Sequence, residues 1–142
     1  MNCLEELVTL DTNEFIFGLR RTPGYPACTE LLFEKLPILN LYVPLQVLLE
    51  LQRNLTNDEM RDVSLALNGA RSVQIDYTPV KTELVHKWKA RGVKKGDAVI
   101  TAKLEEAKIA WLVSENRHFL SEISELPFQV LTSEQMVSLL AS

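Results

Sequence analysis

The chain has 142 residues, of which 46% are hydrophobic, and its 15 Lys and Arg against 19 Asp and Glu give a formal net charge of −4 at pH 7. This length and composition predict a single globular domain over residues 1–142 and exclude an intrinsically disordered chain. No apolar run approaches the roughly 18 residues of a membrane-spanning helix. The first residues are acidic where a secretory signal is basic, so we expect a cytoplasmic protein with no membrane partner. The two cysteines, Cys3 and Cys28, are too scattered for a disulfide framework or a zinc knuckle and are expected to be free thiols.

Apolar segments of strand length alternate along the chain with segments of helical periodicity. This alternation is typical of α/β domains, in which helical crossovers join parallel strands. It predicts a three-layer fold with a mainly parallel five-stranded sheet that is covered by helices on both faces. The strands are expected at residues 7–10, 41–43, 73–77, 109–113 and 128–131.

Helix signals follow the second predicted strand. Pro44 suits the first turn of a helix that carries Glu50. Thr56 and Glu59 match a capping box, and Gly69 offers a C-terminal stop for the helix that this box begins.

The later helices have weaker signals. Thr78 and Pro79 are expected to begin a helix that ends near Gly92. Asp97 lies in the predicted first turn of the next helix, where an acid also suits the helix dipole. A last short helix is expected from Ser133.

Polar side chains cluster after the predicted strands, and in open parallel sheets ligands bind outside the carboxyl ends of the strands. Asp11 follows the first strand, and residues 114–116 follow the fourth. Glu50 and Asp97 lie on helices near the same edge. Each residue alone also suits a cap, a solvated helix face or a turn, but converging carboxylates repel one another unless a cation neutralises them. Oxygen ligands without His or Cys favour Mg²⁺ or Mn²⁺.

Four segments, in this order and spacing, resemble the motifs of the PIN-domain ribonucleases, and especially of the small VapC-type toxins of bacterial and archaeal toxin–antitoxin systems. They are residues 10–13 (Leu-Asp-Thr-Asn), 48–51 (Leu-Leu-Glu-Leu), 96–102 (Gly-Asp-Ala-Val-Ile-Thr-Ala) and 113–119 (Val-Ser-Glu-Asn-Arg-His-Phe). The resemblance spans nearly the whole chain.

The resemblance implies a doubly wound sheet whose carboxylates bind one or two Mg²⁺ or Mn²⁺ ions and hydrolyse RNA. Divalent ions held by carboxylates activate water and neutralise charge on the phosphoryl oxygens. The metal ligands would act directly or through bound water, and neighbouring polar groups would orient them. The implied catalytic residues are Asp11, Glu50 and Asp97, and the implied supporting residues are Thr12, Asn13, Ser114 and Asn116.

One position departs from the family pattern, because Asn116 stands where many members carry a fourth acid. Its carbonyl oxygen can bind a metal but adds no charge, so a second ion would bind more weakly. Glu115, one residue away, is the alternative fourth ligand. His118 is expected to be a partly buried or surface histidine rather than a general base, and His86 to be structural.

A basic segment interrupts this acidic chain. Lys87, Lys89, Arg91, Lys94 and Lys95 form it. Such a segment can contact an RNA backbone, or it can be the solvated end of a helix.

The resemblance also implies a small antitoxin partner whose tail covers the site. A homodimer is a further possibility that the sequence leaves open. Its face would use apolar side chains near Leu31, Leu32 and Phe33, or Leu45 and Leu49, unless these pack in the core.

Another class of function competes with a nuclease, namely a non-catalytic PIN-like module that binds RNA or protein. The neutral Asn116 supports it, and the retained acids oppose it. A phosphoaspartyl phosphatase is weakened by Asn13, where that chemistry needs a second Asp. A receiver domain is weakened because Asp76 lies within a predicted strand.

Overall fold

The computed structural model describes residues 5–141, so Cys3 lies outside the described residues. A five-stranded sheet with the order β3-β2-β1-β4-β5 forms the middle of the molecule, and every neighbouring pair is parallel. The predicted α/β class with a parallel five-stranded sheet is confirmed. The strands are β1 (Leu7–Leu10), β2 (Asn40–Pro44), β3 (Ser72–Asp76), β4 (Trp111–Val113) and β5 (Gln129–Leu131).

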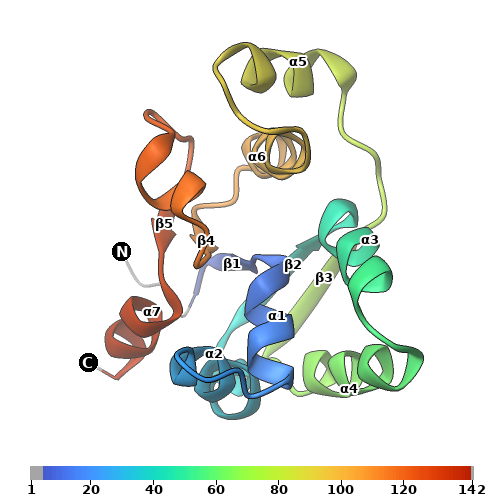
Figure 1. The fold of residues 1–142 in the computed structure, drawn as a ribbon, viewed down its shortest axis with the longest axis vertical. Coiled ribbons are helices and arrows are strands. Elements are labelled where there is room, and N and C mark those ends of the chain that lie inside the picture. The colour runs from blue at the N-terminus through green and yellow to red at the C-terminus, as the bar shows by residue number, and fades with distance from the viewer. Residues whose placement is uncertain (1–4, 142) are drawn as a thin grey trace.

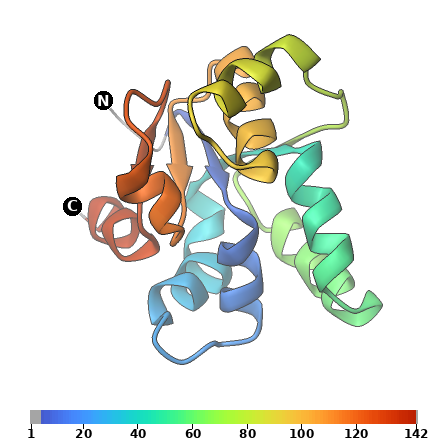
Figure 2. The same cartoon turned by 45° about the horizontal axis from the view of Figure 1, so that its top comes forward.

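Helices cover both faces of this sheet (Figure 1). α5 and α6 lie on one side, whereas α1, α2, α4 and α7 lie on the other, and Figure 2 shows α5 and α6 packed against each other. No helix within residues 5–141 combines the length and the apolar character that a membrane span requires. The helices are α1 (Thr12–Leu19), α2 (Pro26–Glu30), the π-helix η1 (Leu31–Lys35), the 3₁₀-helix η2 (Leu36–Ile38), α3 (Leu45–Asn54), α4 (Asn57–Asn68), α5 (Thr82–Ala90), α6 (Lys95–Ala107), the π-helix η3 (His118–Glu122) and α7 (Ser133–Leu140).

The direction of the chain across the sheet changes between β1 and β4. From β1 the chain proceeds outward to β2 and β3, and then returns to β4 and β5 on the other side of β1. The Asp11 N–H donates to the Val113 carbonyl over 2.9 Å, and the Ser114 N–H donates to the Leu131 carbonyl over 2.9 Å. The first residues after β1 and β4 therefore lie side by side at the switch point, where ligands of open parallel sheets bind.

The central strands are buried on both faces, which explains their nearly continuous apolar sequences. Val8, Leu41 and Leu112 are at most 1% exposed. Thr9 is also fully buried, and its hydroxyl donates to the Tyr42 carbonyl over 2.8 Å. The one polar side chain within β1 is thus hydrogen-bonded, as buried polar groups require.

Helix capping was predicted well at α4 and less well at α3 and α5. The capping box of Thr56 and Glu59 is present. The predicted start of a helix at Thr78 is wrong, because the Thr78 N–H donates to Asp76 Oδ1 and this turn delays α5 until Thr82. Pro44 does not lie in a first helical turn either, because it ends β2 in extended conformation and precedes α3.

The apolar side chains considered for a homodimer face divide into two groups. Leu31 and Leu32 are 1% and 3% exposed, so for them the alternative of packing in the core is confirmed. Leu45 is half-buried, whereas Phe33 and Leu49 are exposed. A homodimer remains a prediction.

Gly18 allows α1 and α2 to approach closely. A Cβ atom at this position would lie 2.6 Å from the Cys28 carbonyl oxygen and 3.2 Å from Leu32 Cβ. Since the first of these neighbours is backbone, it cannot rotate away.

We expect Gly18→Ala to lower the free energy of unfolding by about 1–3 kcal/mol, because the added methyl group forces the two helices apart. Urea denaturation measures the change. The control is Ser64→Ala on the exposed side of α4, which should change the stability by less than about 0.5 kcal/mol. Equal stabilities of Gly18→Ala and the wild type would contradict the close contact.

Candidate functional site

Asp11 occupies the switch point and is only 6% exposed. It caps α1, with Oδ1 accepting from the Thr12 N–H over 2.8 Å, and Oδ2 accepts from the Ser114 hydroxyl over 2.7 Å. Burial raises the pKa of Asp11 and the two hydrogen bonds lower it, and with the smaller raising effect of the Asp97 and Glu50 charges the pKa becomes about 6. The carboxylate is thus held in place by polar contacts where its charge is costly.

Ser114 and Asn116 extend this arrangement from β4 to α6. The Ser114 hydroxyl accepts from the Asn116 N–H over 3.0 Å, and Asn116 Nδ2 donates to Asp97 Oδ2 over 3.2 Å. Burial raises the pKa of Asp97, whereas nearby His118 and the Asn116 hydrogen bond lower it. A continuous set of hydrogen bonds therefore joins Asp11 to Asp97.

Glu50 joins the site from α3. Its Oε1 accepts from the Thr12 hydroxyl over 2.6 Å, and its Oε2 accepts from Gln46 Nε2 over 2.8 Å. A Cβ atom at Gly96 would lie 3.1 Å from Glu50 Oε2, so this glycine lets the first turn of α6 approach α3. Thr12 thus connects two carboxylates, because its backbone binds Asp11 and its hydroxyl binds Glu50.

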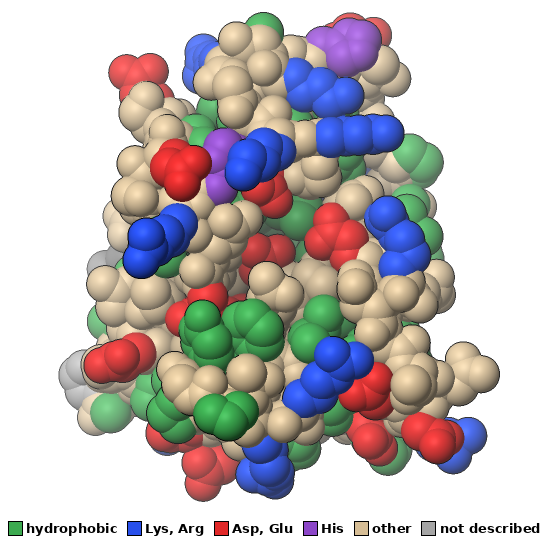
Figure 3. All heavy atoms as spheres, in the orientation of Figure 1, with side chains coloured by type: hydrophobic (Ala, Val, Ile, Leu, Met, Phe, Trp, Pro, Cys, Tyr) green, Lys and Arg blue, Asp and Glu red, His purple; other side chains and the backbone are tan. Residues whose placement is uncertain are grey.

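The structure brings the three predicted carboxylates to one hollow of the surface. Figure 3 shows acidic side chains gathered in the middle of one face, between the elements labelled α1, α3 and α6 in Figure 1. Basic side chains lie above them in the same view. Asn13 is exposed, and its side chain makes no hydrogen bond within residues 5–141. The bonds that orient Asp11 come instead from Thr12 and Ser114.

The donor set of this hollow fits a hard divalent cation. Asp11, Glu50 and Asp97 offer only oxygen ligands, as Mg²⁺ and Mn²⁺ prefer. Asn116 turns its Nδ2 toward Asp97, while its Oδ1 accepts from the His118 N–H over 3.0 Å. Mutual repulsion raises the pKa of Asp11 through Asp97 and Glu50, and of Asp97 through Glu50, after the larger effect of burial. Along the described chain, oxygens of the three carboxylates do not all lie within 4.8 Å of one another.

His118 lies beside this site and was not assigned to it from the sequence. It is 6% exposed, and its Nε2 accepts from the Lys94 N–H over 3.2 Å, which places the ring proton on Nδ1, 3.3 Å from Glu122 Oε1. Its Nε2 is also 4.0 Å from Asp97 Oδ2. His118 therefore anchors the residue that precedes α6, and with it the position of Asp97. Only the three-dimensional arrangement reveals this role.

Glu115 does not join Asp97 and instead meets α7. Its Oε2 accepts from the Ser133 N–H over 2.9 Å. Ligand atoms of Glu14, Cys28 and Glu115 all lie within 4.8 Å of one another. Burial, followed by the neighbouring Glu115, raises the pKa of Glu14 to about 10, and burial raises the pKa of Cys28 to about 12. Nothing in the sequence analysis pointed to Glu14.

The basic segment splits into engaged and available side chains. Lys87 pairs with Glu105 over 2.9 Å, and the Arg91 guanidinium stacks 4.9 Å from the centre of the Trp88 ring. Lys94, immediately before α6, is exposed, and its charge lowers the pKa of Asp97, although burial has the larger, opposing effect.

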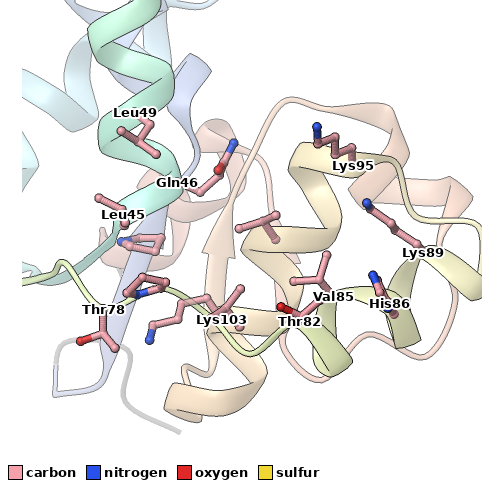
Figure 4. A pocket seen from close by; sticks show the side chains of 14 residues that line it. Leu45, Gln46, Leu49, Thr78, Thr82, Val85, His86, Lys89, Lys95 and Lys103 are labelled. Atoms are coloured by element: carbon pink, nitrogen blue, oxygen red, sulfur yellow. The ribbon is translucent and has the colours of Figure 1, made fainter.

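The other two lysines, Lys89 and Lys95, line an apolar groove of about 320 Å³ between α3, α5 and α6 (Figure 4). His86, the histidine expected to be structural, is exposed and also lines this groove. Gln46 connects the groove to the acidic hollow, because it lines the groove and donates to Glu50.

Comparison with known proteins gives a likeness of fold. No protein-family model matches the sequence, and no curated protein matches it. Among solved structures, a chain of VapBC2 from Rickettsia felis bound to a DNA fragment from their promoter is similar, with a TM-score of 0.57 and 16% sequence identity. The match covers 88% of this chain and 98% of that one. The two chains therefore share an α/β fold over nearly their whole lengths.

We expect the acid at position 14 to make the metal-free protein less stable as the pH rises. Between its ordinary pKa of 4.5 and its folded pKa of about 10, the folded chain keeps a proton that the unfolded chain has released. The free energy of unfolding therefore falls with pH across that window, by at most about 1.4 kcal/mol per pH unit for one group. Glu14→Gln should flatten this fall and raise the stability at pH 7.

Urea denaturation in EDTA at pH 5, 7 and 9 measures this effect. The control is Glu34→Gln at an exposed position, which should follow the wild-type pH profile. Parallel profiles for Glu14→Gln and the wild type would show that Glu14 does not hold a proton in the folded state.

Proposed function

We propose that this chain is a divalent-metal-dependent endoribonuclease of the PIN type. One observation carries the proposal: Asp11, Glu50 and Asp97 come from three separate segments and meet at the switch point of the sheet through shared hydrogen bonds. Bringing carboxylates together costs free energy, so a bound cation is the simplest reason for such a site.

The residues of the hollow divide into ligands and supports. Asp11, Glu50 and Asp97 would hold Mg²⁺ or Mn²⁺. Asn116 would become a neutral fourth ligand only when its amide oxygen leaves the His118 N–H, from which it accepts over 3.0 Å. When bound, one or two such ions supply an activated water and neutralise charge on the phosphodiester. The Ser114 hydroxyl fixes the direction of Asp11, as Thr12 does for Glu50.

The basic side chains around the hollow favour RNA as the substrate. Lys89 and Lys95 line the adjoining groove, and Lys94 lies next to Asp97 on the same side. Lysines placed in this way contact phosphates on either side of a cleaved bond and add affinity without sequence preference. Lys87 and Arg91 are engaged with Glu105 and Trp88, and they contribute less.

The shared fold supports a role as the toxin of a toxin–antitoxin pair. The similar chain belongs to a VapBC2 complex. By analogy, the partner of this chain is a small antitoxin protein that covers the acidic hollow in the cytoplasm. Exposed Phe33 and Leu49 offer apolar contacts for that partner or for a second copy of the chain.

A non-catalytic RNA-binding module is the second candidate, and the neutral Asn116 favours it. Such a module would keep the fold and the basic groove without binding a metal. Stabilisation by Mn²⁺ separates the two functions, because a module without a metal site gains nothing from the ion.

We expect Mn²⁺ at 100 times its Kd to stabilise the wild type by about 2.7 kcal/mol and to support cleavage of a mixed RNA pool. Asp11→Asn and Asp97→Asn should lose both effects, with cleavage slower by about two orders of magnitude or more, because each removes a charged ligand. Thermal melting and gel analysis of the RNA, each with Mn²⁺ or EDTA, measure the changes.

The matched control is Asp62→Asn on the exposed side of α4, which should behave as the wild type in both assays. Equal Mn²⁺ shifts in all four proteins would refute the assignment of the ligands. A wild type that is stabilised by Mn²⁺ but leaves RNA intact would refute the nuclease.

We expect Lys95→Glu to weaken RNA binding and to reduce the slope of log affinity against log salt by about one, because one phosphate contact is lost. Lys108→Glu reverses a charge at the opposite end of α6 and serves as the control. Fluorescence anisotropy with a labelled RNA in EDTA measures both. Identical slopes for the two variants would show that Lys95 contacts no phosphate and that the basic segment is the solvated end of a helix.

A further inference from the structure

A second polar cluster is buried where α1, α2 and α7 meet, behind the acidic hollow. Cys28 Sγ lies 3.6 Å from Glu14 Oε2 and 3.4 Å from Ser133 Oγ. Glu115 approaches from the end of β4, and ligand atoms of Glu14, Cys28 and Glu115 all lie within 4.8 Å of one another. Three separate segments thus place a thiol and two carboxyl groups together.

An unsatisfied oxygen indicates that something is missing from this cluster. Glu14 is only 1% exposed, yet its Oε1 has no hydrogen-bond partner within residues 5–141. A buried polar atom without a partner costs free energy, and such atoms are rare in folded proteins. Its other oxygen already contacts the Cys28 thiol, so Oε1 is the oxygen that a proton shared with Glu115, or an ion that replaces this proton, would satisfy.

We propose that Glu14, Cys28 and Glu115 bind one Zn²⁺ ion, as a structural site separate from the Asp11 hollow. Three anionic protein ligands leave a fourth position, and the Ser133 hydroxyl is placed to fill it. Binding displaces the protons of the Cys28 thiol and the Glu14 carboxyl group to solvent, so that the thiolate and carboxylates face the ion.

The chemistry of the donors selects Zn²⁺ over the hard cations of the Asp11 hollow. Thiolate is a soft ligand that Mg²⁺ and Mn²⁺ bind poorly, whereas Zn²⁺ accepts sulfur and oxygen together. Zn–S and Zn–O bonds of about 2.3 and 2.0 Å in a tetrahedral arrangement place sulfur and oxygen about 3.5 Å apart. The 3.6 Å between Cys28 Sγ and Glu14 Oε2 agrees with this separation.

The location gives this ion a positioning role. Glu14 follows Asp11 by one turn on α1, and Glu115 lies between Ser114 and Asn116. An ion bound to both would fasten the two segments that carry the hydrogen bonds of Asp11, and it would tie α2 and α7 to them. The site itself does not depend on nuclease activity.

Co²⁺ tests this proposal, because it replaces Zn²⁺ and reports a thiolate ligand by a charge-transfer absorption in the near ultraviolet. The full chain, stripped with EDTA and reduced, is titrated with CoCl₂. We expect this absorption to saturate at one ion per chain and to disappear when Zn²⁺ is added. Cys28→Ser should abolish the absorption, and Glu14→Gln, which keeps the thiol, should weaken Co²⁺ binding at this site by about 100-fold or more.

Two variants serve as controls. Cys3→Ser removes the other cysteine, and Asp97→Asn disables the acidic hollow, and both should keep the absorption. Circular dichroism verifies that each variant is folded, and Glu14→Gln decides the question if Cys28→Ser does not fold. The proposal is overturned if the wild type shows no thiolate absorption, or if Glu14→Gln shows this absorption at wild-type affinity. The cluster would then be two carboxyl groups that share a proton. Co²⁺ bound only in the acidic hollow gives no thiolate absorption, because that site has no cysteine. The absorption therefore tests the Cys28 site alone, and its result does not depend on whether the chain is a nuclease.

Discussion

The buried carboxylate of Asp11 is the constraint on which the rest of the site depends. It lies between the carboxyl ends of β1 and β4, where the crossover direction of the sheet changes, and it is held by one backbone N–H and one hydroxyl. The first donor, Thr12, begins α1, and the second, Ser114, directly follows β4. Thr12 then binds Glu50, and Ser114 binds the backbone that positions Asn116 against Asp97. The arrangement of the acids follows from these few contacts.

The two buried clusters share this framework but differ in chemistry. The acidic hollow offers oxygen ligands, opens to the surface and adjoins basic side chains, as hydrolysis of a charged polymer requires. The cluster of Glu14, Cys28 and Glu115 is deeper and contains a thiol, which suits a structural ion. Glu14 lies one turn beyond Asp11, and Glu115 lies next to Ser114. A movement of Glu14 or Glu115 would therefore also displace Asp11 or Ser114 in the acidic hollow.

Much of this architecture could be predicted from the sequence, because local patterns determine it. Buried parallel strands are apolar, and the residues after them lie at one edge of the sheet. Asp11 follows β1 there, and the crossover helix that leads into β4 begins near the same edge with Asp97, so the two acids could be grouped. Asn116 and Glu115 were alternative fourth ligands, and the structure places Asn116 beside Asp97 and Glu115 against Ser133. Glu14 could not be found in this way, since an acid in a first helical turn is usually solvated. Its burial depends on Cys28 and Ser133, which are 105 residues apart.

Anomalous diffraction from a crystal of the wild-type protein soaked in MnCl₂ tests most directly whether Asp11, Glu50 and Asp97 form a metal site. We expect a manganese peak in the hollow, bound to Asp11 and Asp97 directly or through ordered water, and its loss from a soaked Asp97→Asn crystal. A fully soaked wild-type crystal with manganese elsewhere on the surface and none beside these carboxylates would contradict it.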